Sequence, residues 1–498
     1  MPVVAGVDSS TQSAKVELRD LDSGRVVGAG RAAHPPATPP RSEQDPASWW
    51  HALVIAMHEA LDAAAAAGIR PADVVAVSVA GQQHGLVVLD ATGVVIRPAK
   101  LWNDTESAPD AGWLIGQLDG GAAAWAAACG SVPVASFTIT KLSWLHRSEP
   151  AAFARIARVL LPHDWLTHRL TGDHTTDRGD ASGTGYWSPI EGRYRIDLLD
   201  IVDAETDWAA ALPRVLGPLD AAGPMRPDAA DELGLPAGLL VAAGTGDNMA
   251  SALGVGLRPG DLAVSVGTSG TVFAVTDEPA TDATGAVAGF ADATGRFLPL
   301  VCTLNAALAT EAVGRLLGVD HAGLDALALS APAGSDGVVF VPYLAGERTP
   351  NRPDATGTIT GLRTDVTRPQ IARAAFEGVV CGLLDGADAL TAAGATGASH
   401  ATDGRLLLVG GGSRSAAYRQ VLADLTGRVV TVADAPEPAT AGAGVQAAAV
   451  HQGVDPITIA DAWGLATGHL VEPTLVTDAD ADAGDAAAIR AAYTAARG

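Results

Sequence analysis

Lysine, cysteine and long apolar runs are scarce in this chain of 498 residues, and each scarcity excludes a class of protein. None of the three lysines (Lys15, Lys100 and Lys141) follows a glycine, so the Gly-Lys-Ser/Thr of a Walker P-loop is absent. The three cysteines (Cys129, Cys302 and Cys381) form no Cys-x-x-Cys pair, which excludes a zinc knuckle and a disulfide scaffold. No apolar stretch approaches the roughly 18 residues of a membrane span, and the segment up to Asp8 lacks a basic leader. We therefore expect a cytoplasmic protein.

Positive charge is also in short supply. Asp and Glu number 56 against 32 Lys and Arg, which gives a net charge of −24. A field of that sign repels phosphate backbones and anionic lipid headgroups, so neither nucleic acid nor a membrane surface is expected as a partner. Hydrophobic residues make up 48% of the chain and charged residues 18%, which is enough apolar material for large cores.

Short β-branched runs alternate with longer Ala-rich stretches along the whole chain, a pattern typical of α/β proteins. The expected buried strands are Val3–Val7, Val74–Val79, Leu239–Ala242, Leu262–Val266, Gly337–Val341 and Arg405–Val409, and the expected helices are Pro46–Ala66, Pro369–Ala393, Ser415–Gly427 and Ala486–Arg497. The Pro-, Gly- and Asp-rich segment Pro213–Pro236 and the stretch Gly254–Gly260 favour a boundary near residue 250. We expect two domains, residues 1–250 and 251–498.

Two segments of like design open these halves. Val3–Leu18 and Leu262–Val275, about 259 residues apart, each combine an apolar run, a tight turn of small hydroxyl residues and a second apolar-alternating run. Such a strand–turn–strand brings several backbone N–H groups close to phosphates. Each segment taken singly is also compatible with an ordinary β-hairpin. Because one opens each half, we interpret them as parts of two related domains that face a shared nucleotide.

Other nucleotide and hydrolase motifs fail in context. The pattern Gly-x-Gly-x-x-Ala occurs at Gly28–Ala33 and Gly442–Ala447, but neither copy joins a strand to a helix as a dinucleotide fold requires. No Gly-x-Ser-x-Gly elbow and no His-Glu-x-x-His helix is present. Nicotinamide enzymes, serine hydrolases of that type and zinc proteases are therefore disfavoured.

Asp247 is the first candidate catalytic residue. The apolar strand from Leu239 ends in Ala243-Gly-Thr-Gly246, and a helix is predicted to begin at Asp247. This is the strand-to-helix edge where α/β proteins bind ligands, and a carboxylate there can accept a hydroxyl proton. The alternative is a plain helix N-cap.

Two further clusters suggest ligand contacts. Leu406–Ser415 is a strand, a triple glycine and a helix start, which suits close approach by a flat or anionic group but also fits a Gly-rich turn with no ligand. Ala80–Gly85 and Leu101–Asp104 place Gln, His, Asn and Asp at strand ends beside a Trp, as a polyhydroxylated ligand requires. His84 by itself is equally compatible with a buried core histidine.

Taken together these residues resemble the FGGY carbohydrate kinase family of the actin-like ATPase superfamily. Phe137–Leu145 is similar to the first family signature, and Gly357–Leu362 followed by Gln370–Glu377 is similar to the second. The segments that resemble the D-xylulose-phosphorylating branch are Ser42–Trp50, Gly81–Gly85, Leu101–Asp104, Leu161–Leu166, Arg178–Thr184, Gly246–Ala250 and Pro342–Pro350. The resemblance runs from Val3 to about residue 450. It implies two actin-like (ribonuclease H-like) α/β domains with a nucleotide and sugar cleft between them.

The resemblance also implies roles for individual residues. The nucleotide side comprises Asp8, which faces Mg²⁺ through water, Ser10, Thr11 and Ser13 on the first phosphate loop, Thr268 on the second, and Gly411, Gly412 and Ser415 beside the adenosine. The sugar side comprises Gln83, His84, Trp102, Asp104, Asp247 and Asn248, with Asp247 and Asp8 catalytic. Ser415 stands where relatives often have Asn, and Gln83 stands where the bacterial pattern has Met, so sugar preference is expected to be shifted or wider.

The implied reaction is ATP-dependent phosphorylation of D-xylulose to D-xylulose 5-phosphate in D-xylose catabolism, with ATP and Mg²⁺ as cofactors. Two other classes remain open, a non-catalytic actin-like nucleotide switch and a nucleotide-binding regulator that reads the sugar. The sugar cluster beside Asp247 disfavours the first, and the pair Asp8 and Asp247 disfavours the second. Kinases for ribulose, glycerol and gluconate share the implied fold, and a homodimer is one alternative for the oligomeric state.

Overall fold

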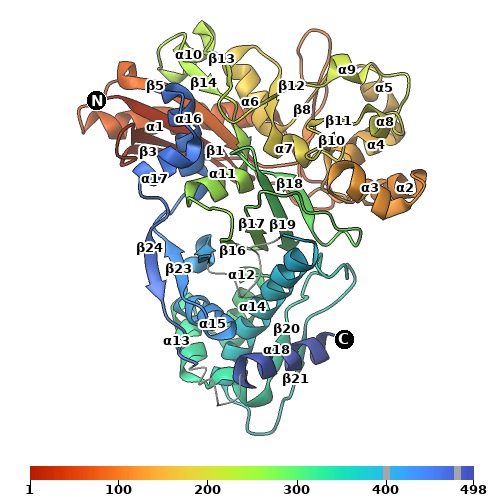
Figure 1. Cartoon of the computed structure of the whole chain (residues 1–498), viewed down its shortest axis with the longest axis vertical. Coiled ribbons are helices and arrows are strands. Elements are labelled where there is room, and N and C mark those ends of the chain that lie inside the picture. Colours follow the sequence, from red (N-terminus) through yellow and green to blue (C-terminus); the bar gives the residue numbers. More distant parts are fainter. Residues whose placement is uncertain (396–403, 476–483) are drawn as a thin grey trace. The chain divides into compact units, whose positions relative to one another are not determined.

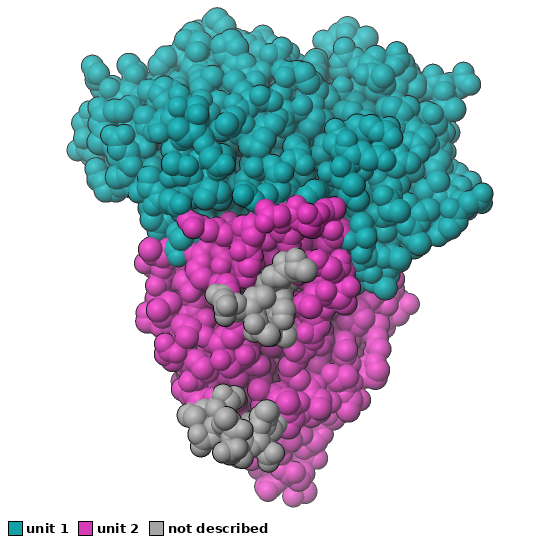
Figure 2. All heavy atoms as spheres, in the orientation of Figure 1, with its two compact units in different colours: residues 1–256, 281–298, 437–466 teal, residues 257–280, 299–436, 467–498 magenta. Residues whose placement is uncertain are grey.

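The computed structural model describes residues 1–395, 404–475 and 484–498 (Figure 1). The chain divides into two compact units, each built from segments that are not contiguous in sequence (Figure 2). Unit 1 comprises residues 1–256, 281–298 and 437–466, and unit 2 comprises residues 257–280, 299–436 and 467–498. Among the described residues, no helix is both long enough and apolar enough to span a membrane.

Unit 1 is built on a mixed sheet with the strand order β13-β14-β5-β1-β2-β3. Its strands are β1 (Val3–Ser9), β2 (Ser13–Asp20), β3 (Val26–Ala33), β5 (Val74–Gly81), β13 (Ala221–Pro224) and β14 (Leu240–Ala242), with the short β15 (Thr245–Gly246) also paired to β5. The first three strands form an antiparallel meander, whereas β5 runs parallel to β1 and to β14. The carboxyl ends of β1, β5 and β15 therefore meet at one edge of the sheet.

Helices cover both faces of this sheet because successive residues of β1 point to opposite sides. On one face, β1 and α1 (Pro46–Ala65) share a buried cluster, to which they contribute Val3, Ala5, Val7, Trp49 and Leu53. On the other face lies α16 (Pro438–Gln452), which also packs against α11 (Asp247–Gly254). A Cβ at Gly6 would lie 2.1 Å from the carbonyl oxygen of Thr440 in α16, so only glycine permits this approach.

A second hydrophobic cluster in unit 1 lies away from this sheet and includes Trp125, Ile139, Phe153 and Trp208. The elements that supply or border it are β6 (Val87–Leu89), α2 (Ala108–Gln117), α3 (Gly121–Cys129), α4 (Thr138–Ser148), α5 (Pro150–Phe153), β8 (Arg158–Leu160), α8 (Ile196–Leu199) and α9 (Trp208–Ala211). The chain also forms α6 (Pro162–Thr171), β9 (Thr175–Asp177), α7 (Arg178–Ser182) and β12 (Arg214–Leu216), and α6 and β12 contribute to the cluster of the main sheet. Helix α6 contacts β5 and α7 contacts β15, so both helices reach the carboxyl edge of the main sheet.

Unit 2 repeats the sheet design of unit 1. Its strands follow the order β19-β17-β16-β22-β23-β24, with bounds β16 (Leu262–Val266), β17 (Gly270–Ala274), β19 (Phe297–Thr303), β22 (Leu406–Val409), β23 (Val430–Ala433) and β24 (Gly468–Val471). Its helices include α12 (Ala307–Leu317), α13 (His321–Ser330), α14 (Arg368–Ala392), α15 (Ala416–Thr426) and α18 (Gly484–Arg497). The 25-residue α14 packs against α12, α13, α15 and β17, so it organises the core of this unit.

The structure confirms the α/β class and the elements expected from the sequence, with ends that move by a few residues. The strand expected at Gly337–Val341 begins only at Val339, because residues 333–337 form a 3₁₀ turn that contains positive φ angles. The two segments of like design are both antiparallel hairpins, β1–β2 and β16–β17. Gly442–Ala447 lies inside α16, which confirms that it is no dinucleotide loop.

Candidate active site

The first hairpin carries a buried charge cluster. Asp8 is the penultimate residue of β1 and is only 4% exposed. One of its carboxylate oxygens lies 3.4 Å from Lys15 Nζ, which in turn forms a 2.6 Å ion pair with Glu437. Burial raises the pKa of Asp8 to about 6, against the opposing effect of the Lys15 ammonium group. Asp8 is therefore ionised at neutral pH, and its Oδ1 has no hydrogen-bond partner among the described residues.

The turn after Asp8 is tied to the neighbouring loops by side chains. Ser10 closes the turn through N–H and Oγ bonds to the carbonyl of Ser13. Thr11 Oγ1 accepts a 2.8 Å hydrogen bond from Trp102 Nε1 and donates one of 3.3 Å to Gln82. The buried hydroxyl of Ser13 has no partner among the described residues. The phosphate turn proposed from the sequence is thus physically joined to the Gln82–His84 and Trp102 segments.

Asp247 lies at the start of α11 but is not its N-cap. Gly246 occupies the cap position and has no side chain, so the N-cap interpretation of Asp247 is wrong. Asn248 Nδ2 donates to Asp247 Oδ1 at 3.0 Å and to Gln83 Oε1 at 2.8 Å, which aligns these three side chains. Burial raises the pKa of Asp247 to about 8, and the neighbouring carboxylates of Asp8 and Asp180 contribute to this rise. A carboxylate with this proton affinity is suited to act as a general base near neutral pH.

His84 has a backbone conformation that few residues adopt. Its φ is 65°, in the left-handed region that costs a non-glycine residue free energy and is tolerated where neighbours enforce it. Its ring Nδ1 lies 2.7 Å from the carbonyl oxygen of Gly183, and the ring packs against those of Phe137 and Phe290, with centroids 5.1 and 5.5 Å away. The ring is held in a fixed orientation by these contacts, as a residue that reads a ligand requires.

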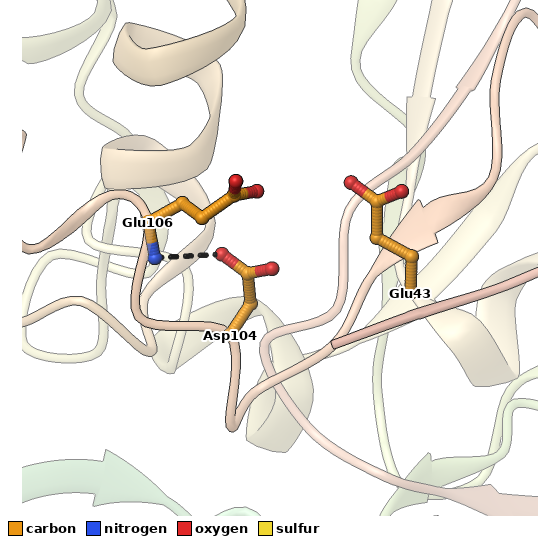
Figure 3. A group of neighbouring side chains, drawn as sticks. All are labelled: Glu43, Asp104 and Glu106. Carbon is orange, nitrogen blue, oxygen red and sulfur yellow. Dashed lines mark hydrogen bonds between the residues drawn. The ribbon is translucent and has the colours of Figure 1, made fainter. Parts of the chain in front are cut away.

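Three carboxylates, those of Glu43, Asp104 and Glu106, gather close to one another (Figure 3). Lys100, which is fully buried, places its ammonium group 3.2, 3.0 and 2.5 Å from them and 3.8 Å from the ring of Trp144. Arg97 also pairs with Glu43, at 2.6 Å, so cationic side chains of the protein partly balance the negative charge of this group. Lys100 had no role in the sequence analysis beyond its rarity.

Both carboxylate oxygens of Asp104 accept hydrogen bonds from other groups of the protein. Its Oδ2 accepts hydrogen bonds from Lys100 Nζ and from the main-chain N–H of Ser42, and its Oδ1 accepts one from the main-chain N–H of Glu106. The side chain is fully buried. Asp104 thus fixes the loop that carries Trp102.

In unit 2 the glycine loop and the second hairpin turn lie at the ends of adjacent parallel strands, β22 and β16. A Cβ at Gly412 would lie 2.4 Å from the side chain of Val266, whereas Gly411 is exposed with only the end of Arg414 nearby. Thr268 accepts main-chain hydrogen bonds from Ala306 and Leu308 through its carbonyl oxygen. Of the glycines expected beside a nucleotide, one is thus required by packing and the other borders open space.

Ser415 caps the helix that follows this loop. Its Oγ accepts a hydrogen bond from the main-chain N–H of Tyr418 and donates one of 2.6 Å to Asp325. Its hydroxyl is therefore engaged within the protein.

Sequence reasoning missed a buried cluster behind the sugar residues. His163, Asp164, Asp177 and Asp180 are all at most 4% exposed and lie in or beside α6 and α7. From the sequence, Leu161–Leu166 and Arg178–Thr184 were identified only as segments that resemble the family, with no role for individual residues. A signal was present, because Leu161–Leu166 places a histidine and an acidic residue among apolar residues, but spacing alone does not show that this segment meets the one with Asp177 and Asp180.

Comparison with known proteins gives the family. The model of the FGGY family of carbohydrate kinases matches with its N-terminal domain at residues 3–254 and with its C-terminal domain at residues 262–450. The xylulose kinase of Streptomyces coelicolor is 47% identical over 473 residues, which cover 95% of this chain and 92% of that one. The chain belongs to the FGGY family of carbohydrate kinases, and is accordingly an ATP-using sugar kinase.

Solved structures agree. The crystal structure of xylulose kinase from Bifidobacterium adolescentis has a TM-score of 0.83 and 40% identity, covering 100% of this chain and 99% of that chain. Gluconate kinase from Lactobacillus acidophilus has a TM-score of 0.86 at 22% identity, covering 99% of this chain and 96% of that chain. Because kinases named for two different sugars match equally well in shape, the fold alone does not select the sugar.

Proposed function

We propose that the protein transfers the γ-phosphoryl group of ATP to the C5 hydroxyl of D-xylulose. The observation that carries the proposal is the aligned set Asp247, Asn248 and Gln83, in which a carboxylate of high proton affinity lies among amides that suit sugar hydroxyls. The 47% identity to a xylulose kinase over nearly the whole chain supports the choice of sugar.

In the proposed mechanism Asp247 accepts the proton of the C5 hydroxyl while the hydroxyl oxygen attacks the γ-phosphorus in line. A new P–O bond forms to the sugar, the bond from the γ-phosphorus to the β,γ-bridging oxygen breaks, and that oxygen leaves with ADP. Only the ionised carboxylate can accept a proton, so a pKa of about 8 gives a strong base that is mostly protonated at neutral pH.

Asp8 is proposed to hold Mg²⁺ through water. Its buried Oδ1 lacks a hydrogen-bond partner among the described residues, and the carboxylate is ionised at neutral pH, so the site fits a hydrated cation. Magnesium supplies charge neutralisation for the phosphates when bound. Lys15 holds the Asp8 carboxylate from the other side, which fixes its orientation.

The remaining nucleotide contacts are assigned to main-chain turns and small side chains. We assign the phosphates to the turn of Ser10, Thr11 and Ser13 and to Thr268, and the adenosine to Gly411, Gly412 and the start of the Ser415 helix. Because the Ser415 hydroxyl is engaged by Asp325, we expect it to shape the loop rather than to bind the base.

The sugar contacts are assigned to Gln83, His84, Trp102 and Asn248 beside Asp247. Gln83 Nε2 is buried and has no partner among the described residues, so it can donate to a sugar hydroxyl. Asp104, with both oxygens engaged, acts through the position of Trp102.

An ADP-release assay across D-xylulose, D-ribulose, L-ribulose, glycerol and gluconate tests the proposal, with mass detection of the product. D-xylulose is expected to have the highest kcat/KM. D-ribulose should fall behind about ten- to a hundred-fold and glycerol by several orders of magnitude, because each unpaired buried polar group costs about 1–3 kcal/mol.

A higher kcat/KM for glycerol or a ribulose would contradict the choice of sugar. ADP binding with no phosphorylated product from any sugar would favour a nucleotide switch or a sugar-reading regulator instead.

A further inference from the structure

His163 lies at a junction between the segments that carry the proposed sugar-binding and catalytic residues. It is fully buried on α6, and its Nδ1 lies 2.8 Å from Asp180 Oδ2 on α7. Its Nε2 lies 3.2 Å from Asp164 and 3.8 Å from Asp177. The Nδ1 contact with Asp180 orients the ring, and the Asp164 and Asp177 carboxylates lie near Nε2, which forms no hydrogen bond among the described residues.

The histidine packs directly on two glycines at the carboxyl edge of the sheet. A Cβ at Gly81 would lie 2.9 Å from His163 Cβ, and a Cβ at Gly244 would lie 2.6 Å from His163 Cδ2. Gly81 ends β5 and precedes Gln83 and His84, whereas Gly244 precedes β15 and Asp247. Both strand ends therefore rest against the same histidine.

The two ends of α7 form hydrogen bonds with the segment before Asp247 and with His84. Asp177, the N-cap of α7, accepts a 2.7 Å hydrogen bond from Thr245 Oγ1, two residues before Asp247. At the other end of α7, the carbonyl of Gly183 bonds to the ring of His84. The helix that His163 anchors through Asp180 thus contacts both sides of the proposed sugar site.

We propose that His163 is a positioning residue, which sets the relative placement of Asp247 and His84 by anchoring α7 and the ends of β5 and β15. This inference deepens the proposed sugar-kinase function and rests on it. His163 itself does not touch the substrate. A displacement of about 1 Å at such a site is enough to lower turnover about a hundred-fold.

Charge within the cluster is consistent with this role. Burial acts to lower the pKa of His163, but the carboxylates of Asp164 and Asp180 outweigh it and raise the pKa to about 9. Burial raises the pKa of Asp180, opposed by His163 and by the main-chain N–H of His84. The imidazolium therefore balances acidic groups that otherwise repel one another and Asp247.

The test compares His163→Leu with His163→Asn. Asparagine keeps an N–H donor at the place of Nδ1, and leucine of similar size keeps none. We expect His163→Leu to lower kcat with D-xylulose about 10- to 100-fold and to raise the sugar KM, with the ATP KM unchanged within about twofold. His163→Asn should stay within about fivefold of wild type. His168→Asn, on the same helix, is the matched control.

Thr245→Val keeps the proposal testable if His163→Leu does not fold. It removes only the hydroxyl that bonds to Asp177, and we expect a roughly three- to tenfold loss of kcat with the ATP KM unchanged. The proposal is overturned if folded His163→Leu and Thr245→Val keep wild-type kcat and sugar KM, or if His163→Asn is as impaired as His163→Leu.

Amide hydrogen exchange separates this inference from the proposed function. In His163→Leu, or in Thr245→Val if the former does not fold, peptides that cover residues 81–85 and 244–248 should exchange faster than in wild type and in His168→Asn. Unchanged exchange in both peptides contradicts the positioning role. If the wild type phosphorylates no sugar, the proposed function fails while the exchange result still decides the role of His163.

Discussion

The two hairpins that open the two halves share a backbone design and differ in charge. In β1–β2 the buried Asp8 is paired across the ladder with Lys15, and Lys15 bonds to Glu437. In β16–β17 the ladder runs from the pair Leu262 and Ala274 to the pair Val266 and Gly270, and Gly267, which is 259 residues after Asp8, lies in the turn. The segment Leu262–Val275 contains no ionisable side chain, and its turn is held by main-chain hydrogen bonds.

This difference indicates a division of labour between like folds. The first hairpin belongs to the unit that also carries Asp247 and His163, whose pKa values burial and neighbouring charge shift far from their usual range. The second belongs to the unit whose candidate contacts are glycines, hydroxyls and main-chain groups. Chemistry that moves a proton needs ionisable side chains, whereas holding a nucleotide needs donors in fixed places. We therefore expect substitutions in unit 1 to affect kcat and those in unit 2 to affect the ATP KM.

Asp247→Ala is expected to have the largest effect in this comparison. Loss of a positioned general base lowers turnover by about 10²–10⁴, with nucleotide binding nearly intact. Steady-state kinetics and ADP titration measure the two effects. Asp228→Ala, an exposed acidic residue in the first turn of α10 (Pro227–Leu233), is the matched control. A variant that keeps more than about a tenth of wild-type turnover, with chemistry rate-limiting in both, would refute the role of Asp247 as base.

Asp8→Asn tests the charged hairpin itself. Removal of one charge beside the phosphates should lower kcat about 10- to 100-fold and raise the Mg²⁺ concentration needed for half-maximal rate. The sugar KM should change little. Asp22→Asn, in the exposed turn after β2, is the control. An unchanged Mg²⁺ requirement together with a higher sugar KM would contradict the assignment of Asp8 to the metal and phosphates, and would indicate a role in sugar binding.

Asp247→Asn should stabilise unit 1 at high pH. The pKa of Asp247 is about 8 in the folded protein and 3.8 as the ordinary value, so the wild type loses stability as pH rises from about 4 to about 8. The variant lacks this loss. Its advantage should grow by about 1–3 kcal/mol between pH 5 and pH 9, with an allowance for solvent screening. Thermal unfolding at both pH values checks this, and an equal advantage at both would contradict the raised pKa.

Gly411→Ala and Gly412→Ala form a matched pair in unit 2. Gly411 borders open space, so its added methyl group should raise the ATP KM several-fold with stability unchanged. At Gly412 the methyl group would meet Val266 at 2.4 Å, so that variant should have a lower Tm. If Gly411→Ala leaves the ATP KM unchanged, the loop does not contact the nucleotide.

Local patterns in the sequence were sufficient to predict the hairpins and the helix that begins at Asp247, because each is encoded by adjacent residues. The hydrogen bonds between Asn248 and Gln83 and between Trp102 and Thr11 were not predictable, since each joins segments far apart in the chain. The same applies to Lys100, whose role depends on three carboxylates from two separate segments of the chain. Asp104 shows the limit most clearly, because only the structure reveals that both its oxygens are engaged.

The pH dependence of kcat/KM for D-xylulose tests most directly whether Asp247 is the base. With ATP saturating, we expect the wild-type value to fall about tenfold per pH unit below pH 8, because protonated Asp247 cannot accept a proton. In Asp247→Ala this acid limb should be absent from the residual activity. An acid limb at the same pH in both proteins, or a wild-type profile that is flat from pH 6 to pH 9, would contradict the assignment.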